Sequence, residues 1–275
     1  MPSVPSITLN NAVQIPQLGF GTFQIPPEDT RETTLAALNT GYRHIDTAQM
    51  YGNEKGVGQA VRDSGLDRAD VFVTSKLNND AHGHDNALRA FDRSLEALGL
   101  DYLDLFLIHW PLPAKGDFVD TWKGMEEIYR SGRAKAIGVS NFQPRHLRRL
   151  MEDSDVVPAV NQIEVHPYLS QDDVRAFGAE HQIATEAWSP IAQGKVLDDP
   201  TINRIAQRVG KTPAQVTLRW HLQRGDIVFP KSVTQKRIEE NFDLFDFELT
   251  TADLGEISAL DRDERTGPDP DTFNG

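Results

Sequence analysis

The segment YLDLFLIHW (102–110) is a continuous apolar run that ends on polar His109. Two earlier segments, YRHIDTA (42–48) and VFVTSKL (71–77), have the same form. Continuous apolar runs are typical of parallel strands that are buried on both faces. The three runs begin about 30 residues apart, which is the length of one strand–helix repeat. They therefore predict successive parallel strands, each followed by a helix.

The same alternation extends over most of the chain. Five further strand-like segments are QLGFGTF (17–23), AKAIGVSNF (134–142), AVNQIEVHP (159–167), IATEAWSPI (183–191) and DIVFPKS (226–232). Helical patterns follow the eight segments at 29–40, 53–64, 84–98, 118–131, 144–153, 171–181, 199–209 with 212–223, and 234–243. Eight such units in about 250 residues predict a (β/α)8 TIM barrel. No linker interrupts the pattern, so one domain over 1–275 is expected.

Segments outside the eight units are also predicted. An N-terminal β-hairpin is expected at 6–16, turning at Asn10-Asn11. An extra C-terminal helix is expected near 250–261, followed by a loose Pro/Gly/Asp-rich tail that ends at residue 275. Helix starts are predicted at Ser170, Thr212-Pro213 and Thr250-Thr251.

The composition restricts the class of protein. The 275 residues include 41 acidic and 28 basic ones, a net charge of −13, which disfavours binding to nucleic acid or anionic lipid. Cysteine is absent, which excludes disulfides, thiolate chemistry and cysteine-ligated metals. No apolar run is long enough for a membrane span and no secretory signal is recognised, so we predict a cytoplasmic protein. It is expected to be a monomer.

Four polar residues lie at or just after predicted strand ends: Asp46, Tyr51, Lys76 and His109. Strand C-termini are where a parallel barrel builds its active site. An Asp, a Tyr, a Lys and a His together can supply a tuned proton donor, which points to carbonyl reduction by a nicotinamide cofactor. That reaction requires a hydride on carbon and a proton on oxygen. A Tyr has an ordinary pKa near ~10, so a neighbouring Lys76 ammonium is expected to lower the pKa of Tyr51. Asp46 would keep Lys76 charged, and His109 could donate a ring N–H to the carbonyl oxygen.

Each of these residues alone has an ordinary structural explanation. An Asp at a strand end can cap a helix, a His can be a hydrogen-bonded scaffold group, and a Lys can extend to solvent. The set of four favours catalysis. The remaining histidines lack the spacing of metal ligands, so no metal site is predicted. His82 and His84 are closely spaced, but no further ligand accompanies them. The others are interpreted as structural or surface residues: His44, His146, His166, His181 and His221.

Four longer motifs carry a family resemblance: GYRHIDTAQMYGNEKGVG (41–58), GRAKAIGVSNF (132–142), NQIEVHP (161–167) and VFPKSVTQKRIEEN (228–241). The chain resembles the aldo-keto reductases over nearly its whole length, and is most similar to the bacterial group that contains 2,5-diketo-D-gluconate reductases. The resemblance implies reduction of an aldehyde or ketone by NADPH. It also implies a catalytic tetrad of Asp46, Tyr51, Lys76 and His109, with Tyr51 as the proton donor.

The Rossmann fingerprint GxGxxG is absent, so the cofactor is expected to bind through loops that follow the late strands of the barrel. The resemblance implies which residues contact it. Ser140, Asn141 and Gln162 match nicotinamide carboxamide contacts, and Trp188 matches the stacking aromatic. Lys231, Ser232 and Arg237 match contacts to the 2′-phosphate of NADPH (or NADP+) at a helix N-terminus. Other matched positions are Gly21, Thr22, Ser189, Ile191, Gln193, Val233, Glu240 and Asn241. Core packing of Trp188, structural amides at Asn141 and Gln162, and a solvated charged helix over 234–243 are the alternatives.

The substrate pocket departs from the family pattern. The family usually has Leu-Trp-Asn where this chain has Leu77-Asn78-Asn79. A wider and more polar pocket is therefore expected, and a 2,5-diketo-gluconate substrate cannot be carried over. The residues predicted to contact the small carbonyl substrate are Phe23, Asn78, His109 and Trp110.

Two other functions remain open from the sequence. One is an NADPH-binding regulatory or redox-sensing subunit with weak catalysis, which the intact tetrad disfavours. The other is a metal-dependent barrel isomerase or hydrolase, which the lack of a carboxylate and histidine ligand cluster disfavours.

Overall fold

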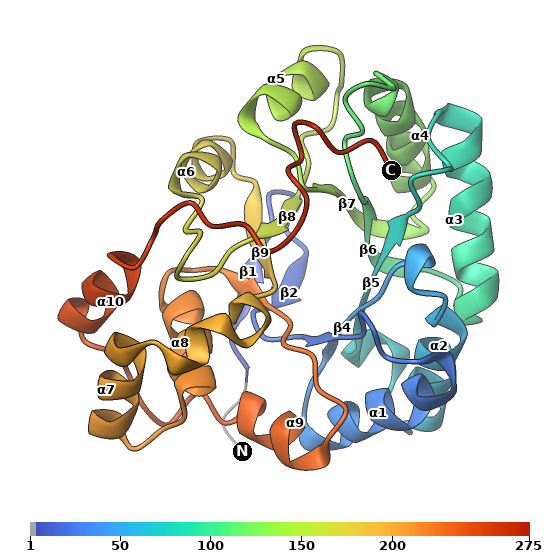
Figure 1. Cartoon of the computed structure of the whole chain (residues 1–275). Helices are drawn as coiled ribbons and strands as arrows, with labels where there is room; N and C mark the ends of the chain where they lie inside the picture. The colour runs from blue at the N-terminus through green and yellow to red at the C-terminus, as the bar shows by residue number, and fades with distance from the viewer. Residues whose placement is uncertain (1–3) are drawn as a thin grey trace.

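Eight parallel strands form the centre of the computed structural model, which describes residues 4–275 (Figure 1). In sheet order they are β10 (Ile227–Val228), β9 (Ala184–Trp188), β8 (Val160–Glu164), β7 (Ala134–Ser140), β6 (Leu103–Ile108), β5 (Phe72–Leu77), β4 (His44–Asp46) and β3 (Phe20–Gly21). Backbone hydrogen bonds join the two edges, from Gly19 N to Val228 O at 2.7 Å and from Val228 N to Gln17 O at 3.0 Å. The predicted TIM barrel is confirmed.

Helices surround the strands, as the alternation in the sequence predicted (Figure 1). They are α1 (Pro27–Thr40), α2 (Glu54–Asp63), α3 (His84–Leu98), α4 (Phe118–Arg130), α5 (Pro144–Glu152), α6 (Asp172–Glu180), α7 (Pro200–Val209), α8 (Pro213–Gln223), α9 (Gln235–Phe242) and α10 (Thr251–Ser258). Short 3-10 helices occur at η1 (Gln49–Tyr51), η2 (Arg68–Asp70) and η3 (Ala192–Asp198). No helix within residues 4–275 is both long and apolar enough to cross a membrane.

Two of the three predicted helix starts are correct. Thr212 and Thr250 cap α8 and α10, each in a reciprocal capping box with the residue three positions later. Ser170 does not cap α6. Its hydroxyl instead donates to Asp261 Oδ2 at 2.5 Å, so it joins the start of α6 to the segment after α10.

The end of the barrel at which the strands begin is apolar and is covered by the predicted hairpin. Its strands β1 (Ser6–Thr8) and β2 (Gln14–Pro16) pair antiparallel, with Ile7 opposite Ile15. Fully buried Ile15 packs in a cluster with Phe72 of β5 and Leu105 of β6. This end is therefore closed, and polar chemistry is confined to the other end.

The prediction of a loose C-terminal tail is wrong, because the tail crosses the open end of the barrel (Figure 1). Glu164, at the end of β8, accepts hydrogen bonds from the backbone N–H of Thr266 at 2.6 Å and of Gly267 at 3.1 Å. Further along, the ring of Phe273 lies 4.5 Å from that of Trp110. A composition rich in Pro, Gly and Asp does not reveal this docking, since the contacts are made with distant strands.

Gly58 allows α2 to pack against the end of α3. A Cβ at Gly58 would collide with the carbonyl oxygen of Leu98, whereas a Cβ at Gly255 of α10 meets no atom within 4 Å. We expect Gly58→Ala to destabilise the fold by about 1–3 kcal/mol, because overpacking outweighs the better helix propensity of Ala. Gly255→Ala, the matched control, should stabilise by up to about 1 kcal/mol. Urea unfolding of both variants measures this; a Gly58→Ala protein as stable as the wild type would contradict it.

Candidate active site

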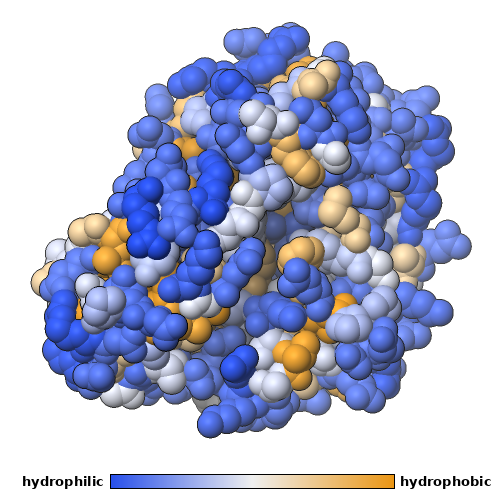
Figure 2. All heavy atoms as spheres, in the orientation of Figure 1, coloured by the Kyte–Doolittle hydropathy of each residue, from blue (hydrophilic) through white to orange (hydrophobic). Residues whose placement is uncertain are grey.

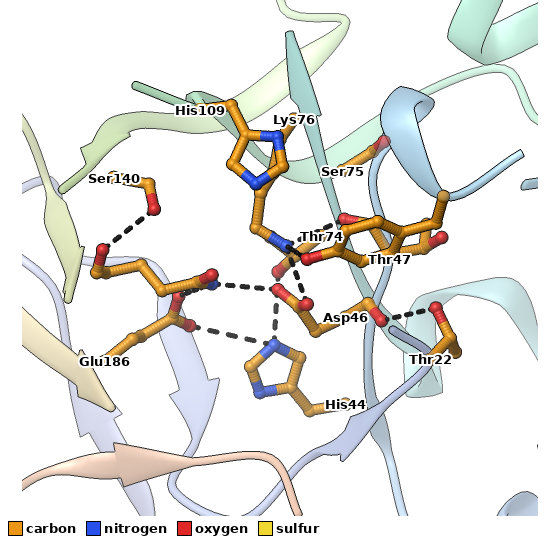
Figure 3. Close-up of polar contacts among 12 residues, drawn as sticks. Thr22, His44, Asp46, Thr47, Thr74, Ser75, Lys76, His109, Ser140 and Glu186 are labelled. Carbon is orange, nitrogen blue, oxygen red and sulfur yellow. Dashed lines mark hydrogen bonds and ion pairs between the residues drawn. The ribbon is translucent and has the colours of Figure 1, made fainter. Parts of the chain in front are cut away.

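The fold brings the four predicted catalytic residues together at the open end of the barrel. Figure 3 labels three of them, Asp46, Lys76 and His109. Asp46 ends β4, Lys76 lies near the end of β5, and His109 follows β6 directly. Tyr51 comes from η1, in the loop after β4. Lys76 Nζ lies 2.7 Å from Asp46 Oδ1 and 3.3 Å from the Tyr51 hydroxyl. The sequence predicted these residues, and their proximity is a result of the structure.

All three hydrogens of the Lys76 ammonium have acceptors. Besides Asp46 and Tyr51, Lys76 Nζ donates to the backbone carbonyl of Thr47 at 3.0 Å. The Lys76 side chain is fully buried, so this set of acceptors replaces water. Burial lowers the pKa of Lys76, but the neighbouring Asp46 and Tyr51 raise it by more, so the pKa lies above its ordinary value. Lys76 is therefore a fixed cation with one N–H directed at the tyrosine oxygen.

The net effect on Tyr51 differs from the prediction. Burial raises the pKa of Tyr51 above its ordinary value, and the Lys76 charge lowers it by less than burial raises it. The expected lowering by Lys76 exists, but the prediction of a lowered pKa is wrong for this structure. Tyr51 is consequently protonated at neutral pH, which is the state that a proton donor requires.

His109 is neutral at the same pH. Burial, together with the Lys76 charge, lowers its pKa well below the ordinary value. Its ring meets the Tyr51 ring edge to face, with centroids 5.9 Å apart, and its Nδ1 is enclosed without a partner among the described residues. A neutral imidazole has one N–H donor, so His109 can present a hydrogen bond beside the tyrosine hydroxyl without adding a charge.

A second polar layer lies beneath the ion pair, and its acid, Glu186, was not predicted from the sequence. Gln162 Nε2 donates to Asp46 Oδ2 at 2.9 Å and to Glu186 Oε2 at 2.8 Å. His44 lies next to Glu186 and was interpreted only as structural or surface (Figure 3). The one available signal was Glu186 itself, a carboxylate inside the otherwise apolar strand segment IATEAWSPI (183–191).

Burial controls the protonation of this layer. Burial and the nearby Asp46 raise the pKa of Glu186 to about 8. Burial lowers the pKa of His44 to about 4, with the Lys76 charge acting in the same direction and a hydrogen bond to Pro16 opposing it. Both groups are therefore uncharged at neutral pH.

The predicted nicotinamide contacts are linked to one another around the rim. Ser140 Oγ donates to the Gln162 backbone carbonyl at 2.8 Å. Asn141 Nδ2 donates to the His109 carbonyl at 2.9 Å, and Asn141 Oδ1 accepts from Trp188 Nε1 at 2.8 Å. Strands β6 to β9 thus hold these side chains in fixed positions next to the catalytic group. Their amides and hydroxyl are chemically suited to a carboxamide.

The predicted phosphate contacts lie at the start of α9. Lys231 and Arg237 are exposed, and neither forms an ion pair with an acidic residue in 4–275. Ser232 is buried, and its hydroxyl accepts from Thr234 N at 3.2 Å. Unpaired cations next to a helix N-terminus, in a chain with a net charge of −13, fit a phosphorylated dinucleotide.

The remaining predicted cofactor positions differ in their surroundings. Glu240 Oε1 accepts from Thr212 at 2.9 Å, so part of its hydrogen-bonding capacity is used within the protein. Ser189 and Gln193 have positive φ angles of 49° and 54°, which is uncommon for residues other than glycine. Gly21 ends β3 and Thr22 follows it, and Ile191 directly precedes η3. Val233 lies just before α9, and Asn241 lies within α9.

Aromatic rings border the predicted substrate pocket. Phe23 is 54% exposed, and its ring centroid lies 5.0 Å from that of Tyr51. Trp110 is covered by Phe273 of the tail, a residue that the sequence analysis did not single out. Asn78 is half-buried and accepts a hydrogen bond from Asn79 N at 2.9 Å. The surface on this side of the molecule is largely hydrophilic, with apolar side chains around a recess near its middle (Figure 2).

Comparison with known proteins decides the family. A profile of the Aldo/keto reductase family matches residues 17–262. The chain belongs to this family. It is 53% identical to an aldo-keto reductase of Mycobacterium sp. (strain KMS) over 98% of both chains, and 48% identical to the methylglyoxal reductase DkgA of Escherichia coli over 98% of both. A crystal structure of a Gox0644 mutant in complex with NADPH superposes with a TM-score of 0.95, at 46% identity over 99% of each chain.

The family assignment confirms the fold and the enzyme class predicted from the sequence. The chain is an aldo-keto reductase, and the 2,5-diketo-gluconate reductase-like group is the correct one. Within residues 4–275, no cluster of three or more His, Asp or Glu residues could hold a metal ion. The individual site residues remain predictions, and the geometry above is their support.

The raised pKa of Glu186 makes a prediction about stability. A carboxyl with a folded-state pKa near 8 and an ordinary unfolded pKa stabilises the fold at pH 5 and loses that contribution as the pH rises toward 8. Glu186→Gln cannot titrate, so its stability relative to the wild type should increase by on the order of 3 kcal/mol from pH 5 to pH 8. Urea unfolding at both pH values measures this. Glu96→Gln, on the exposed face of α3, is the control, and a constant difference for Glu186→Gln would contradict the prediction.

Proposed function

We propose that this protein reduces a small aldehyde or ketone to an alcohol with NADPH, and that Tyr51 is the proton donor. The observation that carries the proposal is the 3.3 Å contact between the Tyr51 hydroxyl and Lys76 Nζ, because Lys76 is itself held by Asp46. We also infer that residues 1–275 form one catalytic domain and that the protein acts as a monomer.

The residues have separate roles in this reaction. NADPH, when bound, supplies the hydride that adds to the carbonyl carbon. Tyr51 gives its hydroxyl proton to the carbonyl oxygen, so one C–H bond and one O–H bond form. The Lys76 ammonium then stabilises the tyrosinate until it takes a proton from solvent. His109 donates its ring N–H to the developing alkoxide, and its neutrality keeps it from displacing Tyr51 as the acid.

The cofactor site supports NADPH as the reductant. The carboxamide partners would be Ser140, Asn141 and Gln162, and Trp188 would provide an aromatic face for the nicotinamide ring. Lys231, Ser232 and Arg237 would hold the 2′-phosphate. The exposure and lack of ion pairing of Lys231 and Arg237 among the described residues support this assignment.

The substrate class is proposed from the pocket and the relatives. Phe23, Tyr51 and Trp110 offer a mainly aromatic opening, in contrast to the wider and more polar pocket expected from Asn78, and Phe273 packs on Trp110 from the tail. The E. coli relative is named a methylglyoxal reductase, and a Bacillus subtilis relative is named a glyoxal reductase. A small dicarbonyl such as methylglyoxal is therefore the first substrate to test.

Tyr51→Phe tests the proton donor. The change keeps the ring but removes the hydroxyl, and general acid catalysis contributes typically ~10²–10⁴-fold, so kcat for methylglyoxal should fall at least that far. Binding of NADPH, measured by fluorescence titration, should persist. Tyr129→Phe on α4 controls for the loss of a tyrosine hydroxyl elsewhere. Near-normal turnover by Tyr51→Phe would exclude Tyr51 as the donor.

Arg237→Ala tests the phosphate contact. Loss of a charge-assisted hydrogen bond costs about 1.5–3 kcal/mol, so the Kd of NADPH should rise by roughly ten- to a hundredfold while that of NADH stays nearly constant. Arg93→Ala, which removes an exposed cation from α3, is the control for net charge. An equal loss of affinity for both cofactors would assign Arg237 a structural role.

A further inference from the structure

The side-chain amide of Gln162 lies between two carboxyl groups. Gln162 of β8 pairs in register with Glu186 of β9, which places both side chains inside the barrel. Gln162 Nε2 donates to Glu186 Oε2 at 2.8 Å and to Asp46 Oδ2 at 2.9 Å. An amide nitrogen carries two hydrogens, so both are used by these contacts.

These two contacts determine which way the amide faces. If the amide were flipped, its carbonyl oxygen would face the Asp46 carboxylate and the hydrogen bond to Asp46 would be lost. Gln162 Oε1 is therefore the free group of this amide. It accepts no hydrogen bond from the described residues and is not among the fully enclosed polar atoms. Because Glu186 and His44 beneath it are fully buried, its open side faces the mouth of the barrel.

Glu186 differs from Asp46 in having no cationic partner. Among the described residues the nearest basic group is His44, with Nε2 at 3.8 Å from Glu186 Oε1. His44 Nδ1 donates to the carbonyl of Pro16 at 3.2 Å, and in the neutral ring Nε2 accepts from the Thr74 hydroxyl at 3.1 Å. Both ring nitrogens of His44 are therefore occupied, and Glu186 Oε1 has no hydrogen-bond partner among the described residues.

The ionisable groups near Glu186 are His44, Asp46 and, beyond Asp46, Lys76, and the Lys76 charge is already neutralised by Asp46. The pKa of Glu186 is raised and that of His44 is lowered, both chiefly by burial. The one hydrogen-bond partner of the Glu186 carboxyl among the described residues is the Gln162 amide.

We propose that Glu186 is a positioning residue for the cofactor: its carboxyl holds the Gln162 amide so that Gln162 Oε1 accepts a hydrogen bond from the carboxamide NH2 of the nicotinamide. This inference rests on the proposed function, since it places the nicotinamide against Gln162. Asp46 by itself would anchor only one N–H, and the terminal torsion of a glutamine is broad. The second anchor from Glu186 removes that freedom.

The test compares binding of NADP+ with binding of its 3-acetylpyridine analogue, in which a methyl group replaces the carboxamide NH2. Fluorescence titration measures both Kd values for each protein. One hydrogen bond predicts that the wild type binds NADP+ roughly five- to tenfold more tightly than the analogue. In Glu186→Leu this ratio should fall toward one.

The isosteric variant keeps the acceptor for Gln162 and removes the acid. In Glu186→Gln the new amide oxygen can accept from Gln162, so the ratio of the two Kd values should stay at the wild-type value. The inference is overturned if Glu186→Gln loses the preference for NADP+ over the analogue, or if Glu186→Leu keeps the wild-type preference. Glu186→Met, which keeps the side-chain volume, takes the same measurement if Glu186→Leu does not fold.

The outcome is independent of the proposed activity. A wild-type protein that oxidises NADPH with methylglyoxal but binds NADP+ and the analogue equally overturns the role of Gln162 Oε1 and leaves the reductase intact. An absence of turnover together with a preserved preference for NADP+ has the opposite meaning, since the positioning role then holds and the proposed reaction fails.

Discussion

A buried ammonium must be neutralised where it lies, and the centre of this site depends on that requirement. Removing Lys76 from water is costly unless all of its hydrogens find acceptors in good geometry. Asp46, the Thr47 carbonyl and the Tyr51 hydroxyl provide them. Each acceptor comes from β4 or the segment that follows it. The ends of β4 and β5 are thus coupled, and Tyr51 is held in place by the same cation that stabilises its conjugate base.

The interior of the barrel is divided into two zones with different chemistry. The closed end is filled by aliphatic and aromatic side chains and by Ile15 of the hairpin. Above it, hydrogen bonds connect Glu186 through Gln162 to Asp46, and His44 is held by the Thr74 hydroxyl and the Pro16 carbonyl. Buried polar groups are tolerated when their hydrogen bonds are satisfied, and such networks fix a single arrangement of side chains. The active site therefore has a rigid polar support as well as an apolar base.

The C-terminal tail completes the open end with groups far away in sequence. Glu164 accepts both backbone N–H groups of Thr266 and Gly267, which places Gly267 directly on the edge of the Trp188 ring. A side chain at Gly267 would collide with this indole, so the tail and Trp188 share one close contact. The position of the ring proposed to face the nicotinamide thus depends on a segment outside the eight strand–helix units.

The sequence by itself determined the barrel and its single run of strand–helix units, and it predicted the four polar residues that meet at the open end, because strand periodicity and strand ends are local properties of the chain. It did not determine the net pKa of Tyr51, since burial depends on every strand around it. Nor did it assign Glu186, whose partners come from β4 and β8, or the docked tail, whose anchor Glu164 lies about 100 residues earlier. Protonation states and long-range hydrogen bonds arise only when distant segments share one buried space, and the tertiary structure alone decides that.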